Sequence, residues 1–140
     1  MNDLSPVKNI MTDKLITVSP NTSISEIEDI FKKNRIHHIP VTNEQKLVGI
    51  ISKSDYLFFK RGYNDLKVED EYDRLRTCRE TASSIMTKRL AVLESKDRIG
   101  VALEIFKENL FHAIPIVENE ELIGIVTTFD IIDKYIPSLS

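Results

Sequence analysis

The chain has 140 residues and a formal net charge of −3, with 41% hydrophobic and 29% charged residues. This length suits one compact fold and excludes an assembly of several enzyme domains. The charge provides no basic field for a nucleic acid or an anionic membrane, and no hydrophobic stretch approaches the ~18 residues of a membrane span. We therefore expect a soluble, cytoplasmic protein with no nucleic acid or membrane partner.

The sequence contains an internal repeat. A shift of 75 positions aligns residues 7–57 with residues 82–132 without a gap, and 16 of the 51 aligned positions are identical. Two copies at so long a period indicate a pair related by a pseudo-twofold axis rather than a solenoid. We assign residues 1–60 to the first repeat, 61–81 to a linker and 82–140 to the second repeat.

Each repeat begins with a predicted short strand, at residues 15–18 and 90–93, which is followed by an amphipathic helix. Thr22 and Ser23 both suit the helix cap, but their counterparts are Asp97 and Arg98, so Thr22 and Asp97 are favoured. Asn34 and Asn109 are expected to end these helices, because asparagine tolerates the left-handed conformation that often follows a helix.

A hairpin and a second helix complete each repeat. In the first repeat, residues 39–42 and 47–52 form the predicted strands, joined by a four-residue loop at 43–46, and the second repeat uses 118–121 as its loop. Pro40 and Pro115 place their strand at an edge or beside a bulge. The second helix starts near Ser54 or Asp55, or near Phe129 or Asp130, and the first crossover makes a parallel, right-handed connection.

The linker at 61–81 has no counterpart in the repeat. Its apolar residues are spaced as in a modest amphipathic helix, at Val68, Tyr72, Leu75 and Cys78. A connecting helix is favoured over a functional insert. Cys78 is the single cysteine, so no internal disulfide forms.

A shared pattern, Gly followed by two aliphatic residues, Ser or Thr, two variable residues and Asp, ends both hairpins, at 49–55 and 124–130. In one interpretation the hydroxyl and the acid only cap the following helix. In the other, the helix start and hydroxyl bind a phosphate while the acid accepts hydrogen bonds from ribose hydroxyls. Gly49 and Gly124 would then let a ligand approach the strand backbone closely.

Histidines precede the first strand of each hairpin. His37 and His112 are shared by both copies and are able to donate to a phosphate, whereas His38 occurs in the first copy alone. His37 and His38 are adjacent on an extended chain, so their rings point to opposite faces and do not suit a metal. Ordinary hydrogen-bonded histidines are therefore favoured over metal ligands.

The ordered blocks resemble the tandem cystathionine-β-synthase (CBS) domain pair over nearly the whole chain. They are an aliphatic-x-x-Ile-Met-Thr block, the amphipathic helix, His-x-Ile-Pro, and the Gly-to-Asp pattern. The resemblance implies an α+β fold of two β-α-β-β-α repeats packed sheet to sheet with pseudo-twofold symmetry. It also implies two related clefts, which in this family often hold adenosyl ligands such as AMP, ADP, ATP or S-adenosylmethionine.

The resemblance also implies roles for individual residues. Asp55 and Asp130 match the ribose-binding acid, Ser52 and Thr127 the phosphate-contacting hydroxyl, and His37 and His112 a position that binds phosphate in some members. The remaining implied ligand contacts are aliphatic or aromatic residues, namely Ile16, Ile36, Ile50, Ala91, Phe111 and Ile125. His38 and Ala113 stand where some nucleotide sensors have arginine, so the site with Asp55, His37, His38 and Lys53 is expected to suit a phosphate better than the site with Asp130.

We expect a regulatory module that binds an adenine nucleotide or another adenosyl ligand, requires no cofactor or metal, and signals to an unknown effector protein or through its oligomer geometry. The family resemblance implies a homodimer. The alternative is a structural dimerisation module with no ligand. A small enzyme has no support, because the sequence contains no P-loop, nucleophile elbow or metal-spaced carboxylate cluster.

Overall fold

The computed structural model describes residues 2–61 and 71–139, with the side chains of 71–74 left out. The described chain has the α+β composition that the sequence predicts, and it divides into two compact units. Unit 1 comprises residues 1–15, 45–47 and 89–140, and unit 2 comprises residues 16–44 and 48–88. Neither unit is one continuous stretch of chain, because the first 15 residues belong with the second half of the sequence.

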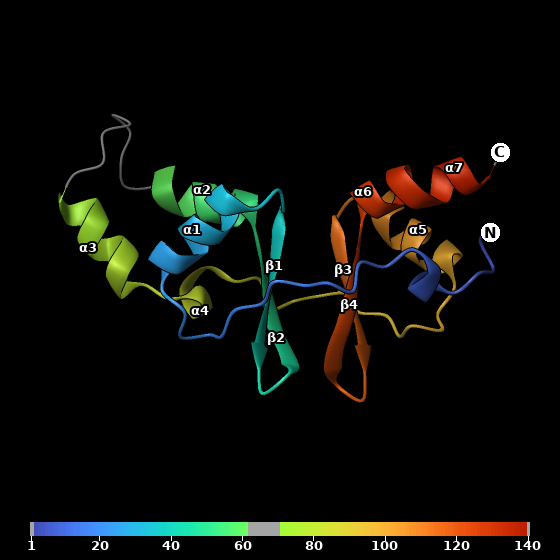
Figure 1. The fold of residues 1–140 in the computed structure, drawn as a ribbon, viewed down its shortest axis with the longest axis horizontal. Coiled ribbons are helices and arrows are strands. Elements are labelled where there is room, and N and C mark those ends of the chain that lie inside the picture. Colours follow the sequence, from blue (N-terminus) through green and yellow to red (C-terminus); the bar gives the residue numbers. More distant parts are fainter. Residues whose placement is uncertain (1, 62–70, 140) are drawn as a thin grey trace. The chain divides into compact units, whose positions relative to one another are not determined.

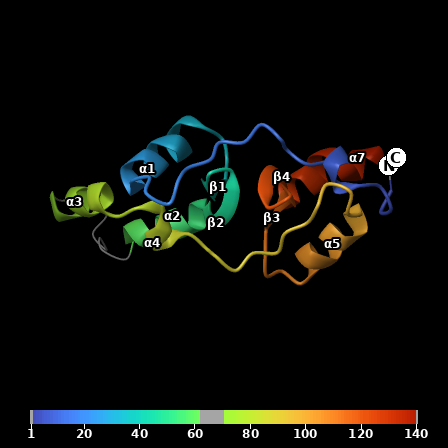
Figure 2. The same cartoon turned by 90° about the horizontal axis from the view of Figure 1, so that it is seen from below.

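Unit 2 is built on a hairpin of β1 (His38–Asn43) and β2 (Lys46–Ser52), although the first two residues of β2 are assigned to unit 1. Helices α1 (Ile24–Lys33) and α2 (Lys53–Arg61) lie on the same side of this hairpin (Figures 1 and 2). Helices α3 (Glu71–Arg79) and α4 (Ala82–Ile85) complete the unit. The buried core residues are Val18, Ile24, Ile27, Phe31, Ile39, Val41, Ile51, Tyr56 and Ala82.

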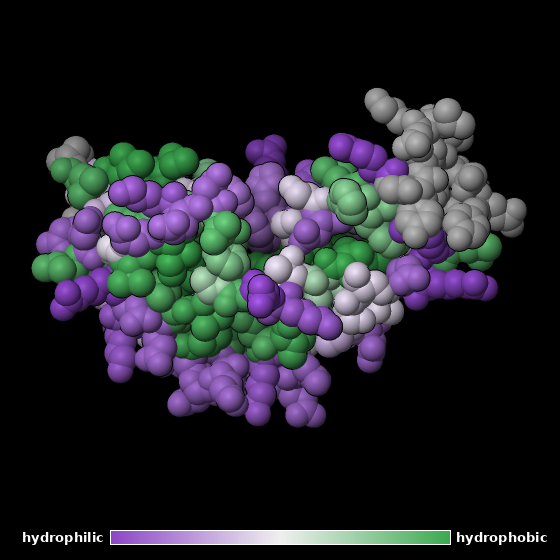
Figure 3. Space-filling model, turned by 180° about the vertical axis from the view of Figure 1, so that it is seen from behind, coloured by the Kyte–Doolittle hydropathy of each residue, from purple (hydrophilic) through white to green (hydrophobic). Residues whose placement is uncertain are grey.

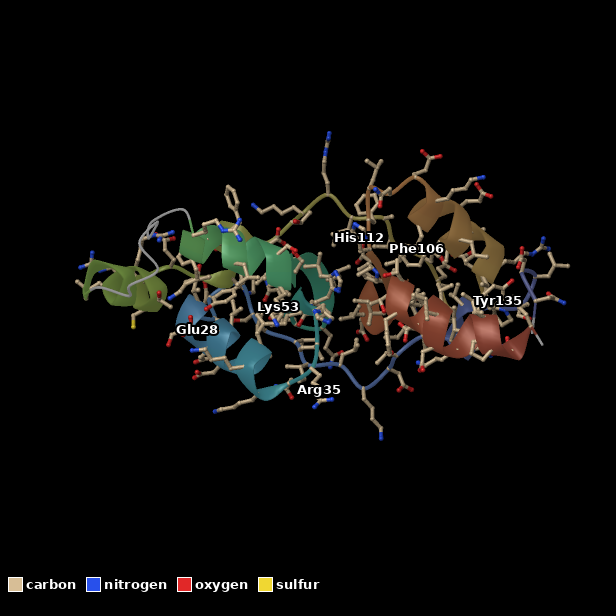
Figure 4. All side chains as sticks on the ribbon, turned by 90° about the horizontal axis from the view of Figure 1, so that it is seen from above. Glu28, Arg35, Lys53, Phe106, His112 and Tyr135 are labelled. Carbon is tan, nitrogen blue, oxygen red and sulfur yellow. The ribbon has the colours of Figure 1, made fainter. Side chains whose placement is uncertain are left out.

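Glu28 connects the two main helices of unit 2 (Figure 4). Its carboxylate accepts a hydrogen bond from the Tyr56 hydroxyl and lies 3.4 Å from Lys60 Nζ, both on α2, and 3.2 Å from Lys32 Nζ on α1. Burial alone would raise the pKa of Glu28, but the Tyr56 hydrogen bond and the two ammonium groups together hold it below its usual value. This charged contact therefore favours the observed packing of α1 on α2.

Unit 1 has a matching hairpin of β3 (Ala113–Glu118) and β4 (Glu121–Thr127), flanked by α5 (Ile99–Lys107). The chain then continues through α6 (Thr128–Asp130), a π-helical turn η2 (Ile131–Tyr135) and α7 (Ile136–Ser138), and the N-terminal 3-10 turn η1 (Val7–Asn9) packs with them. The buried core residues are Val7, Ile10, Leu93, Ile99, Ala102, Ile114, Ile116, Val126 and Tyr135.

Both hairpins turn in two residues, so the predicted four-residue loops are wrong. Glu44 and Gln45 have φ of 53° and 73°, and Asn119 and Glu120 have φ of 51° and 68°. Two consecutive positive φ values are typical of the type I′ turn, whose twist matches that of the flanking strands. In unit 1 the strands pair from Ala113 with Thr127 to Glu118 with Glu121, and a bulge after Ile116 lies beside Pro115, as its proline predicts.

The predicted first strands shrink to single bridges. Val18 pairs with Val41 and Leu93 pairs with Ile116, both in parallel, so the predicted direction is confirmed and the predicted strand length is wrong. The carbonyl groups of Pro40 and Pro115 accept from the N–H groups of Val18 and Leu93 at 3.1 Å.

The predicted helix cap is displaced by one residue. Ser23, not Thr22, caps α1 by accepting from the Glu26 N–H at 3.2 Å, and Arg98 precedes α5 without a side-chain cap. Thr22 and Asp97 instead accept from the N–H groups three residues before them, at Ser19 and Glu94. The helices end where predicted, but of the two asparagines only Asn109 is left-handed, at φ 61°, while Asn34 is extended.

The Ile-Met-Thr blocks explain why the units are discontinuous. The block at 85–87 forms an antiparallel bridge from Thr87 to Ile50 in unit 2, and the block at 10–12 forms one from Thr12 to Ile125 in unit 1. Each block therefore packs on the hairpin of the other repeat. A repeat cannot complete its unit without the block that its partner supplies.

The two shared glycines serve this exchange rather than ligand access. A Cβ atom on Gly49 would lie 2.6 Å from the Sδ atom of Met86, and one on Gly124 would lie 2.6 Å from that of Met11. The methionine side chain thus occupies the space above each glycine. The interpretation that these glycines admit a ligand to the backbone is wrong.

We predict that Gly49→Ala lowers the free energy of unfolding by about 1–3 kcal/mol, because Met86 has to move. Combining it with Met86→Ala should relieve the clash, so the double variant loses less stability than the sum of the single variants. Combining Gly49→Ala with Met11→Ala, in the other unit, is the matched control and should be additive. Urea unfolding measures all five variants, three single and two double, and additivity in both pairs would contradict this packing.

Candidate functional site

Ser52 and Asp55 form a reciprocal pair at the start of α2. The Ser52 N–H donates to Asp55 Oδ2 at 3.0 Å, and the Asp55 N–H donates to Ser52 Oγ at 2.9 Å. This is a capping box, because each side chain satisfies a backbone donor that the helix leaves unpaired. The interpretation that the hydroxyl and the acid of the Gly-to-Asp pattern cap the helix is therefore correct. Whether the same residues are able to bind a ligand depends on which of their oxygen atoms have no protein partner.

A threonine from the second repeat completes this corner. Thr87 Oγ1 lies 3.5 Å from Asp55 Oδ2, a long contact at the limit of a hydrogen bond. We call Ser52, Asp55 and Thr87 the first corner. Within residues 2–61 and 71–139, Asp55 Oδ1 has no hydrogen-bond partner, and Asp55 itself is only partly buried. The first corner therefore retains an unused carboxylate oxygen.

The second corner consists of Thr127, Asp130 and Thr12, in the equivalent arrangement. The Thr127 N–H donates to Asp130 Oδ2 at 2.8 Å, and the Asp130 N–H donates to Thr127 Oγ1 at 3.3 Å. Thr12 Oγ1, from the first repeat, donates to Asp130 Oδ1 at 3.0 Å. Asp130 is only 3% exposed, so this carboxylate is far more deeply buried than that of Asp55.

Lys134 distinguishes the second corner from the first. Its Nζ lies 3.2 Å from Asp130 Oδ1 and also donates to Ile10 O and Thr12 Oγ1, at 3.2 and 3.4 Å. Lys134 is not among the predicted site residues, and the second corner was expected to be the less cationic one. A signal was present: Lys134 follows Asp130 by four residues on a predicted helix, a spacing that brings side chains together.

The helix starts offer little to a phosphate. Besides the capping pairs, the Lys53 N–H donates to the His37 carbonyl at 2.8 Å, and the Thr128 N–H donates to the His112 carbonyl at 3.2 Å. Three backbone donors at each helix start therefore already have protein partners. An anion would have to displace these hydrogen bonds, whereas a hydroxyl donor could reach Asp55 Oδ1 directly.

Asp55 also lines a cavity in unit 2 of about 470 Å³, within the range of small-molecule sites. Its other lining residues come from α2, α3 and α4 and are Phe58, Phe59, Arg76, Glu80, Ser84 and Ile85. None of these six belongs to the predicted site. Arg76 on α3 and Glu80 just after it lie in the linker, which has no counterpart in the repeat to mark them as part of a site, whereas Ser84 lies on α4.

The cavity wall is organised by contacts among these residues. Arg76 donates to the Phe59 carbonyl at 3.3 Å and lies 3.8 Å from the centre of the Phe59 ring, and Ser84 Oγ donates to Glu80 at 2.7 Å. The guanidinium on the ring is a cation–π contact. Helix α3 is thereby joined to α2 at the edge of the cavity.

The other predicted site residues divide between the two units. Unit 2 holds Ile16, Ile36, His37, His38, Ile50 and Lys53, and unit 1 holds Ala91, Phe111, His112 and Ile125. Ile50 and Ile125 are buried, and Ile36 packs against the core of unit 2. Ile16, His37, Lys53 and His112 are exposed, and Figure 4 labels Lys53 and His112. None of them lines the cavity beside Asp55.

Residues 2–61 and 71–139 contain no group of three histidine, cysteine, aspartate or glutamate side chains placed to hold a metal ion. In the same ranges, no helix is long and apolar enough to cross a membrane.

Comparison with known proteins places both repeats in one family. The model of the CBS domain matches residues 7–62 and 82–136. The chain is 30% identical over 153 residues to protein MJ1426 of Methanocaldococcus jannaschii, an alignment that covers 93% of this chain and 90% of that protein. It is 27% identical over 128 residues to the inosine-5′-monophosphate dehydrogenase of Thermoplasma acidophilum, covering 91% of this chain but only 23% of the enzyme.

A solved structure gives the same result. The CBS domain pair of protein MJ0100, in complex with 5′-methylthioadenosine and S-adenosyl-L-methionine, is 27% identical and superimposes with a TM-score of 0.74. The match covers 98% of this chain and 99% of that one.

We predict that Asp130→Asn lowers the free energy of unfolding by about 2–4 kcal/mol, because it removes the counter-ion of Lys134 at a buried site. Asp55→Asn is the matched change in the first corner and should cost about 1 kcal/mol, the value of a helix cap. Urea unfolding of both variants measures the difference. If Asp55→Asn lowered the free energy of unfolding as much as Asp130→Asn, the two acids would contribute equally to stability, which would contradict this difference between the corners.

Proposed function

Because the chain belongs to the CBS domain family, we propose that it is a regulatory module, without catalytic activity, that senses an adenosyl ligand at the first corner. One observation carries the proposal: Asp55 keeps an oxygen without a partner in the described chain and lines a cavity large enough for a small molecule. A carboxylate in that position suits the hydroxyl groups of a ribose, as acidic residues do in dinucleotide-binding proteins.

The charges around the cavity favour particular ligands. Its lining includes two carboxylates, Asp55 and Glu80, and one guanidinium, Arg76. This balance repels the multiple negative charges of ADP and ATP and favours a neutral thioether or a cationic sulfonium. Since three backbone donors at the start of α2 are also already engaged, we propose that S-adenosylmethionine or 5′-methylthioadenosine binds more tightly than AMP, ADP or ATP.

One solved relative supports this choice. The MJ0100 domain pair, at 27% identity, holds 5′-methylthioadenosine and S-adenosylmethionine. In the first corner of the present chain, Asp55 Oδ1 is an acceptor for the ribose group that both molecules share.

Such a module responds to its ligand by changing the relative populations of two packing arrangements of the protein. A coupling of about 1–3 kcal/mol between ligand and partner binding is sufficient for a switch. Arg76 lies on α3 and Glu80 directly follows it, so a ligand in the cavity contacts the helix that joins the repeats along the chain. We propose that α3 transmits occupancy to an effector protein or to a second copy of the chain.

A row of exposed hydrophobic residues supports self-association. Phe129, Ile132, Ile136 and Leu139 follow one another at intervals of three or four along α6, η2 and α7, and all are more than half exposed. Figure 3 shows hydrophobic atoms along this edge of unit 1. A continuous exposed row of this kind is typical of an interface, and we propose that it forms a homodimer contact.

We predict that S-adenosylmethionine and 5′-methylthioadenosine raise the melting temperature by several degrees at a hundredfold excess over Kd, which corresponds to ~2.7 kcal/mol. AMP, ADP, ATP and NAD should raise it less at equal concentration. Asp55→Ala should abolish the shift, because it removes the ribose acceptor. Differential scanning fluorimetry with this panel measures both effects.

The control for that experiment is Asp29→Ala, which removes an exposed carboxylate on α1 of the same unit and should leave the shift unchanged. If no ligand of the panel moves the melting curve, the alternative of a structural dimerisation module gains support. If Asp55→Ala keeps a full shift, the site assignment is wrong even though the sensing function stands.

We also predict that Ile132→Lys combined with Ile136→Lys converts a dimer into a monomer, because two charges would have to be buried in the proposed contact. Size-exclusion chromatography with light scattering measures the mass. Val101→Lys, at an exposed position on α5, is the control and should leave the dimer intact. A monomeric parent protein, or a double variant that stays dimeric, would contradict this interface.

A further inference from the structure

The contacts of Lys134 show how the two corners differ in function. We infer that Lys134 closes the second corner and thereby limits the chain to one adenosyl ligand, held at the first corner. This inference rests on the proposed function, since it concerns which of the two acids is able to receive a ribose. The duplicated sequence pattern, taken alone, predicts two equivalent sites.

The carboxylate of Asp130 already has four donors. Oδ2 receives the Thr127 N–H at 2.8 Å and the Thr127 hydroxyl at 3.2 Å, and Oδ1 receives the Thr12 hydroxyl at 3.0 Å and the Lys134 ammonium at 3.2 Å. An ionised carboxylate has about four acceptor sites, so none remains for a ribose hydroxyl. Asp55 has two such donors, both on Oδ2.

The ammonium of Lys134 is as fully engaged as the acid. Its three acceptors are Asp130 Oδ1, Ile10 O and Thr12 Oγ1, at 3.2, 3.2 and 3.4 Å, which matches the three donors of a lysine. It therefore ties the exchanged segment 10–12 to Asp130. A ligand would have to break the ion pair between the half-exposed Lys134 and the buried Asp130 and release this segment, which is more costly than meeting an open carboxylate oxygen.

The first corner lacks this arrangement because a different residue occupies the equivalent position. Phe59 follows Asp55 by four residues, as Lys134 follows Asp130, and a phenyl ring cannot donate to a carboxylate. The Phe59 ring instead lies under Arg76 of α3, at the edge of the cavity. The difference between Phe59 and Lys134 at equivalent positions thus leaves an oxygen of Asp55 available and occupies both oxygens of Asp130.

The test is isothermal titration with S-adenosylmethionine, using 5′-methylthioadenosine as the second probe. The parent protein should bind one ligand per chain, and Asp130→Asn should keep Kd within twofold while lowering the melting temperature. Lys134→Met, which keeps the side-chain length and removes the charge, should add a second, weaker equivalent. Lys134→Arg keeps the charge, and this variant should still bind one ligand per chain.

The Asp55→Ala variant isolates the second corner. Asp55→Ala alone should bind no ligand, and Asp55→Ala with Lys134→Met should bind one. Two ligands on the parent chain, or a stoichiometry that Lys134→Met leaves at one, would overturn the role of Lys134.

If the parent protein binds neither probe, the proposed function fails. The pairing of Lys134 with Asp130 is then tested by melting temperature. The double variant Asp130→Asn with Lys134→Met should then melt no lower than Asp130→Asn alone, because the two residues act as a pair. Additive losses would overturn the pairing.

Discussion

The fold depends on the exchange of the Ile-Met-Thr blocks between the repeats. Each block lays a methionine over the glycine of the other repeat's hairpin and a threonine against its acid. The glycine has to lack a side chain because the methionine occupies that space, and the acid has to face the block because its threonine is a donor. Residues that are far apart in the sequence are therefore constrained together, and both corners are products of this exchange.

The repeat explains which features were predictable. Helices, hairpins and the capping pairs at Asp55 and Asp130 follow from local patterns that occur twice, so each copy supports the other. The cap at Ser23 was mispredicted because Thr22 and Asp97 close the preceding turn instead. The exchange was not predictable from one repeat alone, and Arg76 and Glu80 were missed because a segment without a counterpart provides no comparison.

The two corners come from the same repeated motif but make different contacts. In the second corner the acid, its threonines and Lys134 satisfy one another, and their combined effect is to tie the N-terminal segment to its unit. In the first corner the same acid supports the helix with one oxygen and leaves the other available beside a cavity. We propose that stability and binding are thereby assigned to different copies of one motif, and that the residue four positions after the acid decides between them.

A crystal structure of the protein grown with S-adenosylmethionine examines the account most directly, because it places the ribose. The account predicts one nucleoside per chain, with its ribose hydroxyls within hydrogen-bond distance of Asp55 Oδ1 and with the Asp130–Lys134 contact intact. A ribose bound to Asp130, or a ligand that makes no contact with Asp55, would contradict it.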